Sequence, residues 1–440
     1  MEIPALYKIF EKHRNISIDS RKDGQNGIFF ALKGQNFDGN QFAAEALKTN
    51  AYAVVDDPSV ALDNRYIVVD NVLNTLHDLA QYHRSHHNIP LIAITGTNGK
   101  TTTKELIAAV LSKKYKTYYT KGNLNNHIGV PLSILEITGE TEIAVIEMGA
   151  SRVGDISLLC SIAKPNYGII TNVGKAHLET FGSFEGVQRT KGELYQYLNS
   201  RNGTAFVNSD NEFLEDMNPP KKVISYGTSK FNHCQGILFD EPSLVKFAWI
   251  SSNDMSDESP QIDWKNPNRI IQTKLFGKYN FENALAAVCV GDYFQVEDIA
   301  IKEALENYTP QNNRSQLHDT GNNRLIIDCY NANPSSMQSS ITNFAQFPGE
   351  NKLLILGEML ELGNVSQREH DVLLQTIEEH GFTEVFLVGE GFHREKQTAF
   401  KYFPNVDHLI EYLRSNPLKN HTILLKGSNG VKLEKVIAYL

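Results

Sequence analysis

The sequence predicts an α/β protein of three domains with a mostly parallel central sheet. Two stretches of the chain each alternate apolar, strand-like runs with helical patterns. The runs of the first stretch are LIAIT, EIAVIEMG, YGIITNVG and GTAFVNSD, at residues 91–95, 142–149, 167–174 and 203–210. Those of the second are NRLIIDCY, KLLILGE, EVFLVGE and HTILLKGS, at residues 323–330, 352–358, 384–390 and 421–428. Such alternation builds parallel sheets, whose ligand sites lie at the carboxyl ends of the strands.

A smaller domain is expected ahead of these stretches. Its strand-like runs are GIFFALKG, AYAVVDD and RYIVVDN, at residues 27–34, 51–57 and 65–71, and a helical pattern follows at 73–88. We therefore predict an N-terminal domain over residues 1–86, a central domain over 87–309 and a C-terminal domain over 310–440. Within the central domain, the polar segment 251–269 predicts a hairpin loop, and residues 277–294 predict a helix after Gly277.

Composition limits the classes of protein that fit this chain. Its 440 residues are 41% hydrophobic and 21% charged, as in ordinary globular proteins. A net charge of −9 argues against a nucleic-acid partner, because such surfaces are basic. Four well-separated cysteines without a C-x-x-C pair indicate reduced thiols, and no apolar run is long enough for a signal peptide or a membrane span. We expect a soluble cytoplasmic protein.

Residues 92–103, IAITGTNGKTTT, predict a phosphate-binding loop between a strand and a helix. Gly96 and Gly99 allow successive backbone N–H groups to point inward, and Lys100 adds positive charge. The Thr101 hydroxyl at the start of the helix suits Mg²⁺. Ile94 stands where the general phosphate-loop pattern has its first glycine, so the loop indicates a nucleotide without identifying the reaction.

Further polar residues follow the predicted strands of the central domain. Glu147 ends one strand, where a carboxylate can reach a metal held at the phosphate loop. His177 follows the next strand, although an isolated histidine is more often structural. Lys191 is expected at the start of a helix, where lysines are ordinarily exposed. Asn280 and Asn283 are one helical turn apart and share a face.

The segment IIDCYNANPSSM places four polar side chains between a strand and Pro334. They are Asp328, Tyr330, Asn331 and Asn333. The same residues also fit a polar turn without a ligand, so the pattern by itself leaves both readings open.

Together, these motifs resemble those of the Mur ligases, which form amide bonds in peptidoglycan precursors. GTNGKTT is common to a wider superfamily that includes folylpolyglutamate synthetases. Four longer stretches resemble the family member that adds D-alanyl-D-alanine: KGNLNNHIGVP, IEMGAS, DCYNANPSSM and LGEMLELG. The segment IDSRKDGQNGIFFALKG resembles a uridine-nucleotide-binding domain.

The resemblance implies a function for each domain. The N-terminal α/β domain would bind the UDP end of the substrate, the central domain would resemble a P-loop ATPase, and the C-terminal domain would be Rossmann-like. The implied reaction joins D-alanyl-D-alanine to UDP-N-acetylmuramoyl-tripeptide through an acyl phosphate, using ATP and two Mg²⁺ ions. A monomer is expected.

The resemblance also implies roles for individual residues. The ATP-binding set is Gly96, Thr97, Asn98, Gly99, Lys100, Thr101, Thr102, Asn280, Asn283, Arg314, Asp328 and Tyr330. The metal-binding set is Thr101, Glu147, His177 and a carbamylated Lys191, and the catalytic set is Lys100, Lys191 and His177. The substrate-binding set is Ser20, Arg21, Asn125, Asn126, Ser151, Asn331, Lys426 and Ser428.

Three positions depart from the family pattern, and three rival functions remain. His127 replaces a usual acid, Tyr279 a usual histidine, and Asn429 a usual arginine. A folylpolyglutamate synthetase would need no uridine-binding domain, and the ligase that adds the preceding amino acid typically carries a DNPR-like motif, which this sequence lacks. A nucleotide-switched binding protein would have the phosphate loop without a substrate domain.

Overall fold

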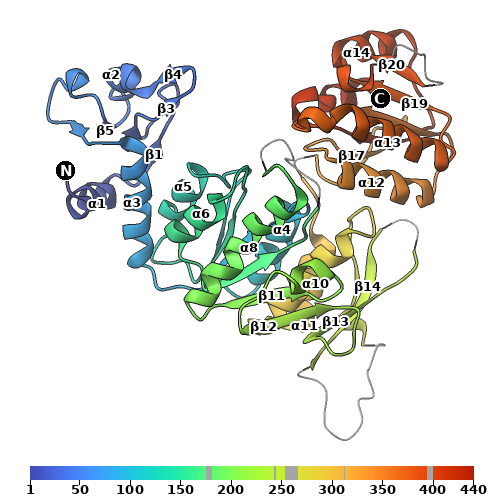
Figure 1. The fold of residues 1–440 in the computed structure, drawn as a ribbon, viewed down its shortest axis with the longest axis horizontal. Helices are drawn as coiled ribbons and strands as arrows, with labels where there is room; N and C mark the ends of the chain where they lie inside the picture. Colours follow the sequence, from blue (N-terminus) through green and yellow to red (C-terminus); the bar gives the residue numbers. More distant parts are fainter. Residues whose placement is uncertain (175–180, 242–243, 253–265, 312, 394–399) are drawn as a thin grey trace, which may run out of the picture.

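The computed structural model describes residues 1–174, 181–241, 244–252, 266–311, 313–393 and 400–440. Within them, three larger β-sheets follow one another along the chain, each with its own helices (Figure 1). The N-terminal sheet lies at one end of the molecule. Helix α12 and strand β17 of the C-terminal sheet lie on the side that faces the central one. The predicted three-part α/β architecture is confirmed.

The N-terminal sheet is parallel, in the order β1-β2-β5-β6. Its strands are β1 (Ile16–Ser17), β2 (Ile28–Phe30), β5 (Tyr52–Val55) and β6 (Tyr66–Val68), and a small hairpin joins β3 (Lys33–Gly34) to β4 (Phe37–Asp38). Its helices are α1 (Ile3–Lys12), α2 (Ala43–Ala46) and α3 (Val72–Ser85). The three predicted strand regions and the helix after them are confirmed, whereas α1 was not predicted.

The central sheet has nine strands in the order β15-β14-β13-β12-β11-β10-β7-β9-β8. They are β7 (Leu91–Thr95), β8 (Thr117–Tyr119), β9 (Ile143–Glu147), β10 (Tyr167–Ile170), β11 (Thr204–Asn208), β12 (Lys222–Gly227), β13 (Cys234–Leu238), β14 (Lys246–Ser251) and β15 (Ile270–Gln272). Pairing is parallel from β8 to β13 and antiparallel from β13 to β15. Strands β14 and β15 form the predicted hairpin. Residues 253–265 of its connection lie outside the described part.

Helices cover both faces of the central sheet. They are α4 (Lys100–Leu111), α5 (Gly129–Leu135), α6 (Asp155–Ala163), α8 (Phe184–Ser200), α9 (Glu212–Glu215), α10 (Asn280–Tyr293) and α11 (Asp298–Asn307). Every residue of β7 is buried: Ile92 and Ile94 pack in the core with α4 and α10, and Ala93 packs in the core with α5, α6 and α8. This double burial explains the continuous apolar run of the sequence.

The C-terminal sheet has the order β16-β17-β21-β18-β19-β20. Its strands are β16 (Gln316–Asp319), β17 (Arg324–Asp328), β18 (Lys352–Gly357), β19 (Val385–Val388), β20 (Lys401–Phe403) and β21 (Thr422–Lys426). The helices α12 (Pro334–Gln346) and α13 (Ser366–Glu379) pack on one face and α14 (Val406–Ser415) on the other. Because β21 lies between β17 and β18, Asp328 and Lys426 come side by side at the strand ends.

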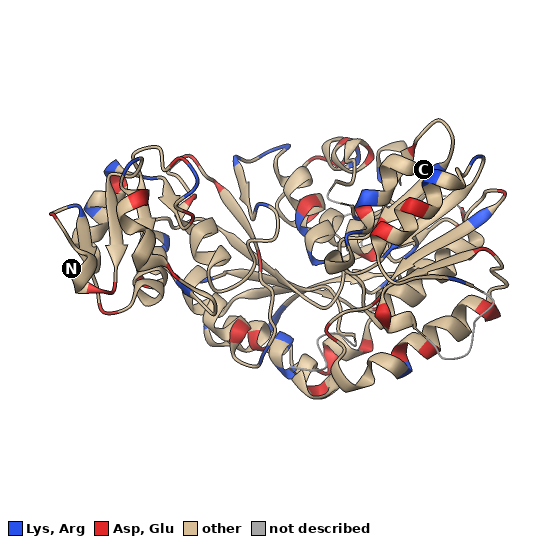
Figure 2. Ribbon diagram, turned by 90° about the horizontal axis from the view of Figure 1, so that it is seen from above, with Lys and Arg blue, Asp and Glu red and all other residues tan. Residues whose placement is uncertain are grey.

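The distribution of charged residues and the state of the thiols match the composition. Along the ribbon, lysine and arginine are interspersed with aspartate and glutamate (Figure 2). The four cysteines are free and buried, as predicted for reduced thiols. In the described ranges, no helix is long and apolar enough to cross a membrane.

Candidate active site

The phosphate loop joins β7 to α4, as predicted. Gly96 and Gly99 have φ angles of +144° and +77°, which side chains with a Cβ adopt rarely. A Cβ at Gly96 would overlap Thr171 Oγ1, and one at Gly99 would lie 2.5 Å from Asn283 Oδ1. Glycine is therefore required at both positions by backbone conformation and by space.

The Lys100 side chain folds back onto this loop and hydrogen-bonds to its backbone. Its Nζ donates to the carbonyl oxygens of Gly96 and Thr97, at 2.8 and 2.9 Å. Desolvation in the cavity lowers the pKa of Lys100 to about 8, against the opposing effect of Glu147. The ammonium group is thus held directly above the backbone that the sequence predicts to cradle phosphate.

A cavity of about 820 Å³ opens in front of the loop. Both the central and the C-terminal sheets contribute residues to its walls. The predicted site residues that line it are Gly96, Thr97, Asn98, Gly99, Lys100, Thr101, Thr102, Asn125, Asn126, Glu147, Ser151, Lys191, Asn280, Asn283, Arg314, Asp328, Tyr330, Asn331 and Lys426. Residues spread over most of the chain therefore meet in one place.

Glu147 lies at the end of β9, where one of its carboxylate oxygens accepts a hydrogen bond. Its Oε1 accepts from Asn125 Nδ2 at 2.8 Å, and its backbone N donates to Thr120 Oγ1 at 3.0 Å. Among the described residues, Oε2 has no hydrogen-bond partner, although Lys104 Nζ lies 3.7 Å away. A buried carboxylate oxygen of this kind suits a hard cation.

Lys104 was not predicted as part of the site. It is fully buried, and its Nζ lies between the carboxylates of Glu147 and Glu105, the latter 3.9 Å away. Burial lowers its pKa. The spacing of four residues between Lys100 and Lys104 in the KTTTK run indicates that both lysines lie on one face of α4. This spacing was the sequence signal for Lys104.

Lys191 contradicts its predicted setting. The sequence predicts an exposed lysine at the start of a helix, whereas Lys191 lies in the middle of α8 and its side chain is buried. Helix α8 begins earlier because the Ser183 side chain caps it by accepting from Gly186 N. Burial and the positive charge of Lys100 lower the pKa of Lys191 to about 7. Its Nζ lies 5.8 Å from the centre of the Phe181 ring.

Asn280 and Asn283 share a buried face of α10, as predicted. Asn283 Nδ2 donates to Asn280 Oδ1 at 2.9 Å, and Asn283 Oδ1 accepts from Thr103 Oγ1 at 3.0 Å. Asn280 Nδ2 donates to Phe276 O at 2.7 Å. The two amides thereby connect α10 to the phosphate-loop helix α4.

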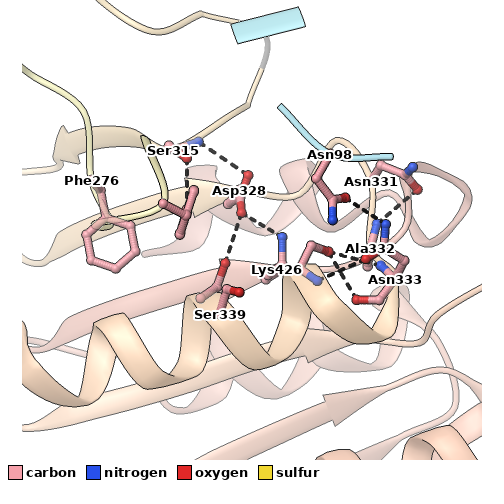
Figure 3. A network of polar contacts seen from close by, with 12 residues as sticks. Asn98, Phe276, Ser315, Asp328, Asn331, Ala332, Asn333, Ser339 and Lys426 are labelled. Carbon is pink, nitrogen blue, oxygen red and sulfur yellow. Dashed lines mark hydrogen bonds and ion pairs between the residues drawn. The ribbon is translucent and has the colours of Figure 1, made fainter. Parts of the chain in front are cut away.

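The end of β17 supplies a polar cluster on the opposite wall of the cavity (Figure 3). Asp328 Oδ2 accepts from Lys426 Nζ at 2.6 Å and from Ser340 Oγ at 3.2 Å. Arg314 and Tyr330 also line the cavity, and the Arg314 guanidinium lies 3.7 Å from the centre of the Tyr330 ring. Asp328, Tyr330 and Asn333 all line the cavity, and Asn333 also caps α12 through a capping box.

The phosphate loop contacts the C-terminal domain directly. Asn333 Nδ2 donates to Asn98 Oδ1 at 2.8 Å, and Asn98 Nδ2 donates to Ser335 Oγ at 2.9 Å. Figure 3 shows Asn98 reaching toward Asn333 at the start of α12. These two hydrogen bonds of the Asn98 side chain join the loop to the first turn of that helix.

The three departures from the family pattern all line the cavity. The Tyr279 hydroxyl lies 3.0 Å from Ser315 Oγ, and burial raises its pKa. The carbonyl oxygen of His127 accepts from His77 Nε2 at 2.6 Å. Asn429 Oδ1 accepts from Lys432 Nζ at 3.4 Å.

Three described residues of the predicted site lie outside the cavity lining. Ser428 is buried behind the cavity wall, where its Oγ accepts from Leu360 N at 3.0 Å. Ser20 and Arg21 lie in the turn after β1 of the N-terminal sheet, and the exposed Arg21 pairs with Asp19 at 2.8 Å. His177 falls outside the described residues.

Comparison with known proteins covers nearly the whole chain. Residues 12–89 match the Mur ligase family catalytic domain, residues 94–291 the Mur ligase middle domain, and residues 313–429 the Mur ligase glutamate ligase domain. The chain belongs to the Mur ligase family.

Individual Mur ligases are similar over their full length. The UDP-N-acetylmuramoyl-tripeptide–D-alanyl-D-alanine ligase of Bacillus subtilis is 34% identical over 96% of this chain and 92% of its own. MurF from Acinetobacter baumannii has a TM-score of 0.81 at 29% identity, covering 96% of this chain and 92% of its own. The MurF ligase from Thermotoga maritima, solved in complex with ADP, has a TM-score of 0.82 at 26% identity, covering 97% and 96%.

Proposed function

We propose that this Mur ligase joins D-alanyl-D-alanine to UDP-N-acetylmuramoyl-tripeptide in an ATP-dependent reaction. One observation carries the proposal: a single cavity combines the phosphate loop with the polar strand ends of the C-terminal sheet. Full-length similarity to ligases with this activity supports it. The rival switch protein is not favoured, because the similarity extends through all three parts of the chain.

ATP would bind between the two cavity walls. The backbone N–H groups of residues 96–102 and the Lys100 ammonium would hold its phosphates, since both favour anions at a helix N-terminus. Asn280 and Asn283 would contact the adenine, Asp328 the ribose, and Tyr330 the face of the base. Arg314, within stacking distance of Tyr330, would reach the phosphates from the C-terminal side. The ADP complex of the Thermotoga maritima relative supports this use of ATP.

Magnesium would bind through oxygen ligands beside the loop. The Thr101 hydroxyl and Glu147 Oε2 fit this role because Mg²⁺ prefers hard oxygen donors. Mg²⁺ is ordinarily held by one or two carboxylates together with phosphate oxygens of the substrate. His177 is proposed for a second ion. The ions would offset the negative charge of the transferring phosphoryl group.

A carbamylated Lys191 is proposed as a further metal-facing group. Carbamylation requires the neutral amine, which attacks CO₂ and releases a proton to give a carbamate. The lowered pKa of about 7 makes the neutral amine available at physiological pH. Conversion to an anion would also remove the repulsion between Lys191 and Lys100.

The chemistry follows from the unreactive nature of a carboxylate at neutral pH. The tripeptide carboxylate would attack the γ-phosphorus of ATP, giving an acyl phosphate and ADP. The dipeptide amine would then attack the acyl carbon, and phosphate would leave. Lys100 would spread charge in both steps. Because both domains wall the cavity, closure would limit hydrolysis of the acyl phosphate.

Substrate contacts are proposed on both walls and at the distant N-terminal sheet. Asn125, Asn126 and Ser151 would contact the peptide from the central domain, and Asn331 and Lys426 from the C-terminal one. Ser428 would act through the backbone that it anchors. Ser20 and Arg21 would bind the uridine diphosphate end.

We also propose that the domains meet at residues 86/87 and 309/310. The protein is further proposed to act as a monomer.

The proposal is tested by identifying the product by mass spectrometry. ATP, Mg²⁺, UDP-N-acetylmuramoyl-tripeptide and D-alanyl-D-alanine should yield the pentapeptide nucleotide. A matched reaction should contain ATP, Mg²⁺, UDP-N-acetylmuramoyl-dipeptide and free lysine or diaminopimelate. Product in the matched reaction alone would favour the ligase of the preceding step and overturn the proposal.

A further inference from the structure

Helix α3 packs against two domains. Its buried residues Leu76, Leu79 and Ala80 belong to one continuous apolar core, which contains residues of strand β2 in the N-terminal sheet and of helices α5 and α6 in the central domain. Figure 1 shows α3 between that sheet and these two helices. Because close-packed elements resist relative movement, α3 fixes the N-terminal sheet against the central domain.

Two histidines of α3 hold the two ends of α5. His77 Nε2 lies 2.6 Å from the carbonyl oxygen of His127, just before α5, and His83 Nε2 lies 2.8 Å from that of Ile137, just after it. Burial lowers the pKa of both histidines, so the neutral ring carries its proton on Nε2 and donates to the carbonyl oxygen. The Nδ1 of His83 is then free to accept from the Tyr7 hydroxyl, 3.1 Å away.

The loop that His77 contacts is part of the cavity wall. Asn125, Asn126 and His127 all line the cavity. On the side of the central sheet, Asn125 Nδ2 donates to Glu147 Oε1 at 2.8 Å. On the opposite side, the loop is held by His77 from a helix that packs on the N-terminal sheet. The position of these cavity residues therefore depends on α3 as well as on the central domain.

We propose that α3 is a spacer that fixes the separation between the uridine subsite and the peptide subsite, with His77 as its positioning residue. The inference rests on the proposed function, in which Arg21 binds the uridine end and Asn125 and Asn126 contact the peptide. Binding energy gained at the remote uridine end helps to place the reacting carboxylate only when the two subsites keep a fixed separation. His77 supplies this rigidity without touching the substrate.

Loss of the His77 contact should slow the chemical step more than it weakens binding. The phosphate loop lies between β7 and α4, and the proposed uridine contacts lie on the N-terminal sheet, so neither depends on this hydrogen bond. The loop before α5 would lose its support from α3 and hold the peptide less accurately. Small errors in the placement of reacting groups lower kcat.

Steady-state kinetics of His77→Leu test this separation of effects. The kcat should fall about tenfold or more, whereas the KM for ATP and the inhibition constant of UDP, measured as a competitor of the tripeptide nucleotide, should stay within about twofold. His77→Gln should restore kcat to within about threefold of the wild type, because its amide nitrogen reaches as far from Cβ as His Nε2 and also donates. His77→Asn, which is polar but shorter, should resemble His77→Leu.

His13→Leu is the matched control. His13 Nδ1 also lies against a backbone carbonyl oxygen in the N-terminal domain, that of Asn26 at 2.7 Å, and neither residue lines the cavity. The kcat of this variant should stay within about twofold of the wild type. Thermal denaturation of all variants shows whether each one folds. Should His77→Leu not fold, the comparison of His77→Asn with His77→Gln decides by the same criteria.

The possible results separate the spacer inference from the proposed function. If the wild type ligates and the Leu and Asn variants lose less than about tenfold in kcat, or if His77→Gln folds without restoring kcat, the spacer inference fails and the proposed function stands. Equal losses in kcat, ATP affinity and UDP affinity would also overturn the inference, because they indicate a general structural defect. If the wild type does not ligate, both fail.

Discussion

The Asn98 side chain donates to Ser335 Oγ and accepts from Asn333 Nδ2, over distances of 2.9 and 2.8 Å. The phosphate loop is thereby joined to the first turn of α12, more than two hundred residues along the chain. Asn98 is also held within its own domain, because its backbone N donates to Asn172 Oδ1 at 2.9 Å. The loop proposed to bind nucleotide and the contact between the two domains therefore share one residue.

We predict that Ser335→Ala raises the KM for ATP about threefold, or about 0.7 kcal/mol, and leaves the Tm unchanged. The Ser335 hydroxyl accepts from Asn98 and donates to Asn333 Oδ1 at 3.0 Å, but the capping residue of α12 is Asn333. Asn333→Ala removes both the contact and the cap, so it should also lower stability by about 1 kcal/mol. Thermal denaturation and ATP titrations of both variants check this difference. Equal stability losses would assign Ser335 a structural role instead.

Lys100→Ala should lower kcat by at least about a thousandfold, since removing a charge from a phosphoryl-transfer site commonly costs several kcal/mol. The fold should persist because the glycines set the loop conformation. Turnover and circular dichroism of the purified variant check both parts. Near-normal turnover would contradict the proposal that the loop binds the phosphates of ATP.

Lys191→Ala should be nearly inactive and partly restored by a short carboxylic acid that fills the vacated space. The acid would replace the carbamate, whereas a small amine of similar size should not restore activity. Activity assays with acetate and with methylamine make this comparison. Full activity without additive would show that no carbamate is needed.

Arg21→Ala should raise the KM for the tripeptide nucleotide at least fivefold. The KM values for ATP and D-alanyl-D-alanine should change much less, because Arg21 lies outside the cavity. Its exposed pair with Asp19 contributes little to stability, so a folding defect is not expected. Lys22→Ala, at the exposed neighbouring position, is the control. Equal increases for all three substrates would contradict a uridine-side role.

His83 should make stability depend on pH. Burial lowers its pKa from 6.5 to about 4, so the unfolded chain binds this proton more readily between those values. His83 therefore makes its full contribution to the free energy of unfolding above pH 6.5. As the pH falls toward 4, this contribution of about 3 kcal/mol is lost. Denaturant unfolding at pH 7 and 4.5 should show a smaller loss for His83→Gln than for the wild type. His408→Gln, at an exposed position, should match the wild type.

The parts of the site that were predictable are those encoded locally. Gly96, Gly99 and Lys100 lie within one strand-loop-helix unit, and Glu147 follows from the rule that parallel strands place their carboxyl ends together. The prediction for Lys191 is wrong because α8 already begins after its N-cap Ser183, so the lysine is buried in the middle of the helix and not exposed at its start. Contacts such as Asn98 with Asn333 depend on how two domains pack, which no local pattern encodes.

Phosphate release by the purified protein tests the central claim most directly. With ATP and Mg²⁺ present, release should require both UDP-N-acetylmuramoyl-tripeptide and D-alanyl-D-alanine, with one phosphate for each amide bond formed. Omission of either substrate should reduce sustained release to the background rate. Sustained release of equal rate without the dipeptide, or no release with all components present, would contradict the account.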